Sequence, residues 1–328
     1  MGKDLIWASF LSLSTNMWGE QGAPAISAGF EDHLTTEDDI WTKVVDFLPG
    51  CGFNAVLIDV GDGIEYESHP ELNIPGAWSK DKLKKELDRL RAMGLTPFPK
   101  LNFSTAHAAW LKDYRRMISS EPYYRVVEDT IKEVAEVFDH PALFHLGMDE
   151  ELDPVQPNNL KSVRPQWLWW HDVNFMFNVC DKVGTRPWMW ADQCWHDPDD
   201  YVKNMSKDTL QSNWYYGTLR RNEDGTFKRI ETQTYHILEQ AGFDQIPTFS
   251  ACGGRWYSAR QTLEMGKNDI APERLKGFMS ASWWFMYERY YYGMLHEAHL
   301  FKHAKAAVYP EECTKEIIDS VSETDERG

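Results

Sequence analysis

Residues 144–151 read Phe144-His145-Leu146-Gly147-Met148-Asp149-Glu150-Glu151, which puts an Asp-Glu pair at the end of a short apolar segment. Successive side chains of a straight strand point to opposite faces, so two adjacent carboxylates converge only where the chain bends at the strand end. The carboxyl ends of the strands are also where a β/α barrel enzyme carries its catalytic groups. The alternative for the pair taken alone is a solvated acidic loop.

Seven further short apolar segments alternate with amphipathic stretches. The expected strands are Leu5–Leu11, Ala55–Asp59, Thr96–Leu101, Leu143–Gly147, Pro187–Trp190, Leu210–Trp214, Pro247–Ser250 and Gly277–Ser282. A glycine follows several of the amphipathic stretches, as expected at a helix C′ position, namely Gly52, Gly94, Gly184 and Gly242. Eight alternating units predict an α/β fold, a single closed (β/α)8 TIM barrel. An open doubly wound sheet is the alternative, but no Gly-rich phosphate loop follows an early strand.

Apolar residues at helical spacing predict helices over 38–48, 80–93 and 126–138, with Ser79 as an N-cap of the second. The last strand is followed by a helical pattern over 287–308. We expect residues 1–310 to form the catalytic barrel and residues 311–328 a polar C-terminal tail that frays near its end.

The composition narrows the classes of partner. The chain has 328 residues and a net charge of −17, which argues against nucleic acid and anionic membranes. No segment approaches the roughly 18 uninterrupted apolar residues of a membrane span. No secretory signal is seen, so a cytoplasmic location is expected if the chain is complete, and a periplasmic or secreted one if a signal was removed. The five cysteines lack paired spacing, so we expect reduced thiols and no metal or cofactor. The oligomeric state stays open.

Several segments, taken in order, resemble the catalytic domain of the glycoside hydrolase family 20 β-N-acetylhexosaminidases. Residues 145–150 are similar to the family motif His-x-Gly-Gly-Asp-Glu, with Met148 in place of the second glycine. Residues 68–78 resemble its Tyr-Pro-Glu-Leu…Gly-Ala-Trp stretch, and residues 99–107 its Pro-Glu-Ile-Asp-x-Pro-Gly-His motif. Residues 190–192 resemble a Trp-x-acid motif of strand five. The resemblance covers most of the chain.

The resemblance implies an exo-glycosidase that cleaves terminal 2-acetamido sugars by substrate-assisted retaining catalysis. Glu150 would be the general acid and then the base. Asp149 would orient the acetamido group that attacks the anomeric carbon, and Tyr257 would hydrogen-bond the acetamido oxygen. The remaining candidates for contact with the carbohydrate substrate are Asp62, His107, His145, Trp190, Asp192, Trp214, Trp283 and Trp284.

The chain also departs from the family pattern. Lys100 and Asn102 replace two acidic residues of the strand-three motif, and Ser258-Ala259 follow Tyr257 in place of the usual Leu-Asp. No arginine stands at the end of the first expected strand, where the family places a sugar-binding one. These changes predict altered contacts to the outer hydroxyls of the sugar.

Three other functions remain open. A glycosidase for another sugar would pair Glu150 with Asp192 or Asp149 as two protein carboxylates. The seventh strand segment, residues 248–254, carries no carboxylate that could act as the nucleophile. A metal-dependent sugar isomerase or epimerase would use Glu150, Asp192, His107 and His196 as ligands, although no tight His-x-His spacing is seen. The last alternative is a carbohydrate-binding barrel without catalysis. For His107 and His145, a structural role is the favoured interpretation.

Overall fold

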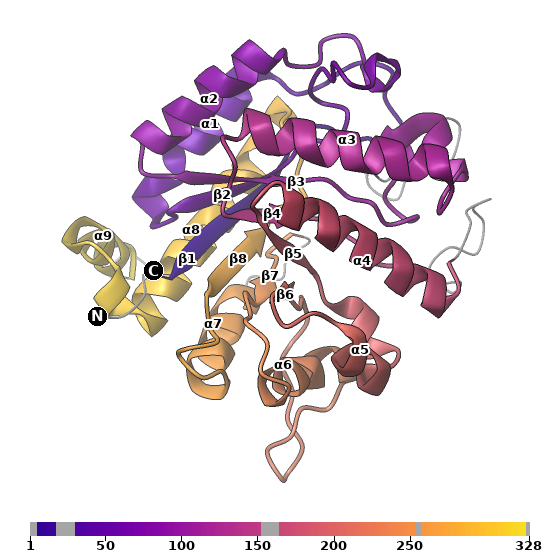
Figure 1. Cartoon of the computed structure of the whole chain (residues 1–328). Helices are drawn as coiled ribbons and strands as arrows, with labels where there is room; N and C mark the ends of the chain where they lie inside the picture. The colour runs from indigo at the N-terminus through magenta and orange to yellow at the C-terminus, as the bar shows by residue number, and fades with distance from the viewer. Residues whose placement is uncertain (1–4, 18–29, 152–163, 253–256, 326–328) are drawn as a thin grey trace.

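The computed structural model describes residues 5–17, 30–151, 164–252 and 257–325. Within these residues, eight parallel strands form one sheet in the order β6-β5-β4-β3-β2-β1-β8-β7 (Figure 1). The strands are β1 (Ile6–Ser12), β2 (Ala55–Asp59), β3 (Thr96–Lys100), β4 (Leu143–His145), β5 (Arg186–Trp190), β6 (Leu210–Ser212), β7 (Thr248–Phe249) and β8 (Gly277–Ala281). Parallel bridges from Gln211 to Gln245 and from Trp214 to Thr248 join the two ends of this sheet. The predicted (β/α)8 barrel is therefore confirmed.

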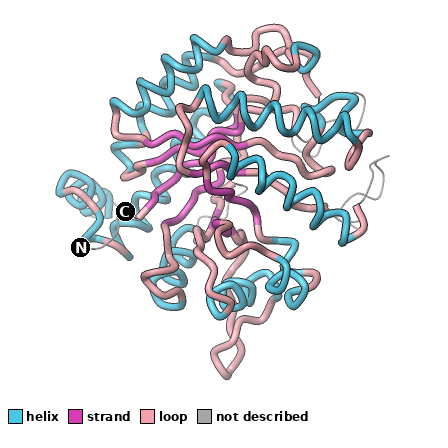
Figure 2. Tube along the Cα trace, viewed as in Figure 1, coloured by secondary structure: helices cyan, strands magenta, loops and turns pink. Residues whose placement is uncertain are grey.

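Helices surround the strands on the outside of the barrel (Figure 2). They are α1 (Asp38–Phe47), α2 (Lys80–Ala92), α3 (Glu121–Val137), α4 (Gln166–Lys182), α5 (Pro198–Asn204), α6 (Ile230–Gln240), α7 (Ser258–Asp269), α8 (Tyr291–Val308) and α9 (Lys315–Asp325). Ser79 caps α2 as predicted, because its side chain accepts a hydrogen bond from the Lys82 amide. Helix α3 begins five residues earlier than expected, because Pro122 in its first turn is compatible with a helix start.

Glycine ends the helices where the sequence predicted it. Gly52, Gly94, Gly184 and Gly242 have φ angles of 88°, 80°, 74° and 79°. These left-handed conformations cost glycine little, and they turn the chain from each helix toward the next buried segment.

The barrel wall separates two layers of side chains. Alternate strand residues such as Phe10, Leu57 and Met279 fill the interior, whereas their neighbours pack outward against the helices. Toward the carboxyl ends of the strands the interior positions become polar, and there Lys100 on β3 donates a hydrogen bond to Asp59 on β2. Both residues of this ion pair are buried. The polar end of the barrel is the end that carries the Asp-Glu pair.

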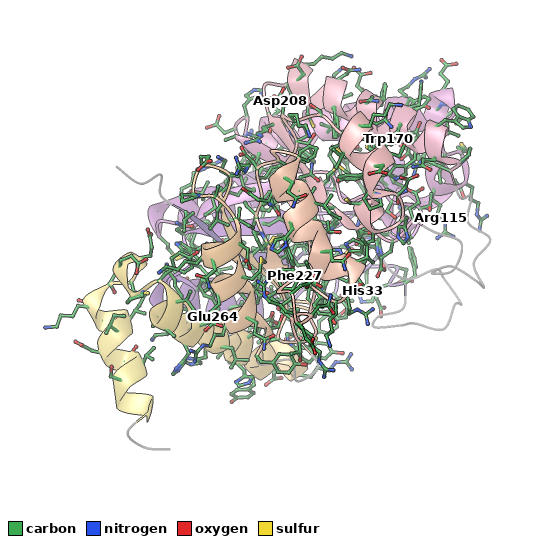
Figure 3. The ribbon with its side chains drawn as sticks, turned by 90° about the horizontal axis from the view of Figure 1, so that it is seen from below. His33, Arg115, Trp170, Asp208, Phe227 and Glu264 are labelled. Atoms are coloured by element: carbon green, nitrogen blue, oxygen red, sulfur yellow. The ribbon has the colours of Figure 1, made fainter. Side chains whose placement is uncertain are left out.

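Helix α9 lies in the segment that the sequence predicted as a polar tail. It packs against α8, with Ile317 buried, and it stands at one side of the barrel (Figures 1 and 3). The domain boundary at residue 310 stays a prediction. Within the described ranges, no helix is long and apolar enough to cross a membrane.

Candidate active site

The chain bends sharply after β4. Gly147, Met148 and Glu150 have φ angles of 71°, 69° and 55°. A left-handed backbone is uncommon for residues other than glycine, and such strain tends to occur at functional sites. This turn is the bend that two adjacent carboxylates need in order to converge, and it follows the fourth strand as predicted.

The two carboxylates converge on one histidine. Nε2 of His107, in the loop after β3, lies 3.3 Å from Oδ2 of Asp149 and 3.3 Å from Oε2 of Glu150. His107 and Asp149 are buried, whereas the Glu150 side chain is 38% exposed. One carboxylate of the pair is therefore enclosed by protein, while the other has access to the space outside the barrel.

Asp149 is held as an anion by its surroundings. Burial alone would raise the pKa of Asp149, but the His107 charge, Lys100 and a hydrogen bond from Asn102 lower it below its ordinary value. The Asn102 amide donates to Oδ1 of Asp149 over 2.8 Å. Conversely, burial alone would lower the pKa of His107, and the two carboxylates raise it to about 9. At neutral pH, His107 is thus a cation between them.

Asp192 supports the turn from the next strand. It begins the short 3-10 helix Asp192–Trp195 after β5, and its Oδ2 accepts the backbone N–H of Glu150 over 2.8 Å. Burial and the charge of Asp149 raise the pKa of Asp192 to about 8. Its Oδ1 is buried and has no hydrogen-bond partner within the described part of the chain. Asp192 therefore fixes the position of the Glu150 backbone through a hydrogen bond.

A buried ion cluster secures the residue that follows the pair. Arg164 donates hydrogen bonds to Glu151, to Asp172 on α4 over 2.6 Å and to the Tyr123 hydroxyl over 2.7 Å. Arg164, Glu151 and Asp172 are all at most 6% exposed. Glu151 is therefore fixed by charge-assisted hydrogen bonds immediately after Glu150.

Aromatic rings from the ends of β5, β6 and β8 lie close together. Trp190 on β5 lies 4.7 Å from the His145 ring and 6.2 Å from Trp283, which follows β8. Tyr216 lies 6.5 Å from Trp283 and stacks on Trp214 at 5.2 Å. The sequence predicted Trp190, Trp214 and Trp283 here. His145 lies inside the barrel, where its Nδ1 accepts the Gly147 N–H, an arrangement that favours the structural role.

Asp62 lies after β2 and is fully buried. It accepts hydrogen bonds from Ser14 over 2.5 Å and from Asn16 over 2.8 Å, both of which follow β1. Asn16 thus stands near the end of the first strand, where the family that the sequence motifs resemble has an arginine. The role of Asp62 in substrate binding stays a prediction.

Two predicted residues lie elsewhere. Tyr257 directly precedes α7 and lines a groove between α7, α8 and α9; Figure 3 labels Glu264, another lining residue, on α7. Trp284 packs outward onto Tyr290 at 5.4 Å and onto the layer between strands and helices. Trp283 and Trp284 both follow β8 but pack on different sides, since Trp283 contacts Trp190 and Tyr216 whereas Trp284 contacts Tyr290. The structure does not bring Tyr257 or Trp284 to the acidic pair.

Three other residues of the site were not assigned a role from the sequence. Asn102 and Tyr216 follow β3 and β6, so their position after a strand was an available signal. Arg164 had no such signal, because its contacts depend on the packing of α3 and α4. Among the described residues, no group of three or more His, Cys, Asp or Glu side chains is arranged to hold a metal ion.

Comparison with known proteins establishes the fold. No family model and no curated protein sequence matches the chain. The GH20 catalytic modules of a pneumococcal exo-β-D-N-acetylglucosaminidase match at 13% identity and a TM-score of 0.60, over 92% of this chain and 83% of that one. The GH20 exo-β-N-acetylglucosaminidase of Vibrio harveyi matches at 13% identity and a TM-score of 0.62, over 92% of this chain and 54% of that one. A Streptomyces plicatus β-hexosaminidase mutant bound to its product GlcNAc matches at 13% identity and a TM-score of 0.59. This match covers 93% of this chain and 68% of the other. The chain therefore has the barrel fold of glycoside hydrolase family 20 β-N-acetylhexosaminidases, as its motifs predicted.

Proposed function

We propose that this chain is a glycoside hydrolase that removes terminal β-linked 2-acetamido sugars by substrate-assisted retaining catalysis. The observation that carries the proposal is the convergence of Asp149 and Glu150 on the His107 ring at the carboxyl end of the barrel. The aromatic residues that follow β5, β6 and β8 support it, because flat apolar rings fit the C–H faces of a sugar. Two of the solved structures with this fold are described as exo-β-N-acetylglucosaminidases.

Glu150 suits proton transfer because its carboxyl group is partly exposed. In this reaction its proton moves to the glycosidic oxygen as the bond to the anomeric carbon breaks. The acetamido oxygen of the substrate bonds to that carbon and forms a cyclic oxazolinium ion. Glu150 then takes a proton from water, and the water oxygen opens the ring with net retention of configuration.

Asp149 suits the acetamido group because it is an enclosed anion. Its carboxylate accepts the amide N–H of the substrate and stabilises the positive charge that develops on the oxazolinium ion. The His107 cation and the Asn102 amide hold this carboxylate in place. His107 also faces Glu150, so it stabilises the carboxylate that Glu150 becomes after it gives up its proton.

The test of the general acid uses Glu150→Gln with two classes of substrate. A general acid matters most when the leaving group is basic, so we expect roughly 10²–10⁴-fold lower kcat/KM on alkyl or disaccharide substrates. We expect a much smaller loss on aryl glycosides with good leaving groups. Glu121→Gln, whose side chain is 85% exposed on α3, is the matched control. Equal losses on both classes would point to a structural or nucleophilic role for Glu150.

The test of the acetamido role uses Asp149→Asn and a thiazoline analogue of the cyclic intermediate. The analogue should bind more tightly than the parent sugar, because a catalytic site complements the transition state. Asp149→Asn should weaken this binding and lower the rate on 2-acetamido substrates. Substrate-assisted catalysis would be refuted if the wild type did not bind the thiazoline and rapidly hydrolysed a glucoside or galactoside that lacks the 2-acetamido group.

A second candidate is a glycosidase with Glu150 and Asp192 as two protein carboxylates. The hydrogen bond from Glu150 N to Asp192 favours it, because it places a third carboxyl group beside the pair. The raised pKa of Asp192, about 8, disfavours it, because a protonated carboxyl group is a poor nucleophile at neutral pH. The thiazoline experiment separates the two candidates.

A further inference from the structure

A second hollow lies on the catalytic face of the barrel. Its walls are the loop before α1 and the loop between β8 and α8, which follow the carboxyl ends of the paired strands β1 and β8. Two strands, β2 and β3, stand between β1 and the strand β4 that precedes the acidic pair. This rim hollow has a volume of about 700 Å³, and its lining includes Glu31, Thr35, Glu37, Tyr287, Glu288 and Arg289.

Tyr287 is a fixed aromatic wall of the rim hollow. Its ring stacks on Tyr290, with the ring centroids 5.9 Å apart and an interplanar angle of 27°. The hydroxyl groups of Tyr287 and Thr35 are hydrogen-bonded over 2.6 Å, which joins the two loops. A ring that is already held in place loses little conformational entropy when a ligand packs against it.

Arg289 is held by aromatic rings and not by a carboxylate. Its guanidinium carbon lies 4.4 Å from the ring centroid of Tyr290 and 5.8 Å from that of Tyr287. Its Nη2 donates a hydrogen bond to the Tyr290 hydroxyl over 2.5 Å. Among the described residues, no carboxylate forms an ion pair with Arg289, although three glutamates line the same hollow. A guanidinium has five N–H donors, so most of them remain available to a ligand.

The polar groups of the rim hollow match the hydroxyl groups of a sugar. The carboxylates of Glu31, Glu37 and Glu288 can only accept hydrogen bonds, whereas the Arg289 guanidinium can only donate them. A sugar hydroxyl both donates and accepts, so neighbouring hydroxyls can bind groups of both kinds through charge-assisted hydrogen bonds. Three negative charges against one positive charge disfavour an anionic ligand. An uncharged sugar ring is therefore the ligand class that fits.

Both walls of the rim hollow continue into the candidate active site. The backbone N–H of Glu31 donates to Oδ1 of Asn16, and Nδ2 of Asn16 donates to the Glu31 carbonyl, each over 2.8 Å. Asn16 also donates to the buried Asp62. The other wall belongs to the loop that carries Trp283, whose ring contacts Trp190. The same two loops therefore border both the mouth of the barrel and the rim hollow.

We propose that the rim hollow is a second carbohydrate subsite, which binds an uncharged sugar residue of the same oligosaccharide that is cleaved at Asp149 and Glu150. The inference rests on the proposed function. Tyr287 would contact the C–H groups of this sugar residue, and Arg289 would donate to its hydroxyls. The preferred substrate would then be an oligosaccharide, since a glycoside with a single sugar cannot occupy both sites.

The experiment compares two substrates in Arg289→Ala and in the control Arg260→Ala. The substrates are an aryl 2-acetamido-β-glucoside and a tetrasaccharide of β-linked N-acetylglucosamine. We expect Arg289→Ala to lower kcat/KM on the tetrasaccharide relative to the aryl glycoside roughly 5- to 50-fold, chiefly through KM. Arg260 is 65% exposed on α7, outside the rim hollow, so Arg260→Ala should leave this ratio within about twofold of the wild type.

A binding measurement supplies a readout that does not depend on turnover. Calorimetry gives the affinity of the tetrasaccharide for Glu150→Gln, which we expect to cleave it slowly. Adding Arg289→Ala to this variant should weaken the affinity roughly 5- to 50-fold, because charge-assisted hydrogen bonds to the sugar are lost. Adding Arg260→Ala should change the affinity by less than about twofold.

The outcomes distinguish this subsite from the proposed function. If the wild type cleaves both substrates, but Arg289→Ala shows the same ratio and the same affinity as Arg260→Ala, the subsite is overturned and the proposed function stands. If the wild type cleaves neither substrate, the proposed function fails. In that case, tetrasaccharide binding that depends on Arg289 would still support a sugar site in the rim hollow, and binding that does not depend on Arg289 would overturn it.

Discussion

Gly147 is the position where a single added methyl group should disrupt both the fold and the site. Its φ is 71°, and a Cβ built there would lie 2.1 Å from Oδ1 and 2.8 Å from Cα of Asn102. Rotation of the Asn102 side chain would not relieve the contact with Cα, so the backbone after β3 must move. Gly147→Ala should therefore pull Asn102 away from Asp149.

The expected cost follows from the contacts of Asn102. Its amide donates to Asp149 over 2.8 Å, and its Oδ1 accepts the backbone N–H groups of Ser104 and Met148 over 3.1 and 3.2 Å. Each hydrogen bond contributes about 1 kcal/mol, and a left-handed alanine costs about 1–2 kcal/mol. Alanine also reduces the conformational entropy of the unfolded chain, which offsets about 0.4–1 kcal/mol of this loss. The net loss of unfolding free energy is about 3–5 kcal/mol.

The control is Gly184→Ala. Gly184 has nearly the same φ, 74°, but no atom lies within 4 Å of the position that a Cβ would take there. Gly184→Ala should lower the free energy of unfolding by only about 1 kcal/mol, because only the backbone strain of a left-handed alanine applies there. Urea denaturation of both variants gives the free energies, and kcat/KM on an aryl 2-acetamido glycoside should fall at least tenfold in Gly147→Ala alone. Losses that agree within about 1 kcal/mol would refute the steric argument.

Arg164→Met should cost about 3–5 kcal/mol of unfolding free energy, because it leaves Glu151 and Asp172 buried without their cation. The exposed control Arg125→Met should cost less than about 1 kcal/mol, and similar losses in urea denaturation would contradict the buried cluster. Burial raises the pKa of Glu297 on α8 from 4.5 to about 7. Between these two pH values the folded state binds one proton more than the unfolded state, so the free energy of unfolding should fall as the pH rises from about 4.5 to about 7. Glu297→Gln should flatten the fall in Tm between about pH 5 and pH 8, and an unchanged slope would contradict this assignment.

Local patterns in the sequence determined the barrel. Strand and helix periodicity each depend on a window of a few residues, and glycine at a helix end depends on its own φ angle. These signals placed both ends of all eight strands within two residues of the observed ends. They also placed Asp149 and Glu150 after the fourth strand, because the carboxyl ends of parallel strands carry the loops that follow them.

Contacts between distant segments were decided only by the tertiary structure. Nothing in the sequence distinguishes Trp283 from Trp284. In the structure, Trp283 packs against Trp190 and Tyr216, whereas Trp284 packs against Tyr290 and the outer layer. Tyr257 and Tyr216 both follow a strand, and the path of each loop placed Tyr216 against Trp214 and Trp283 and Tyr257 against α7, α8 and α9.

The same distinction explains the partners of the acidic pair. Asn102 and His107 meet Asp149 across more than 40 residues of sequence, and Arg164 reaches Glu151 only because α4 packs beside α3. A backbone conformation depends on the residue and its sequence neighbours, so a short stretch of sequence is enough to predict it. The partner of a side chain depends on how the closed barrel brings separate strands together, and no short stretch of sequence contains that information.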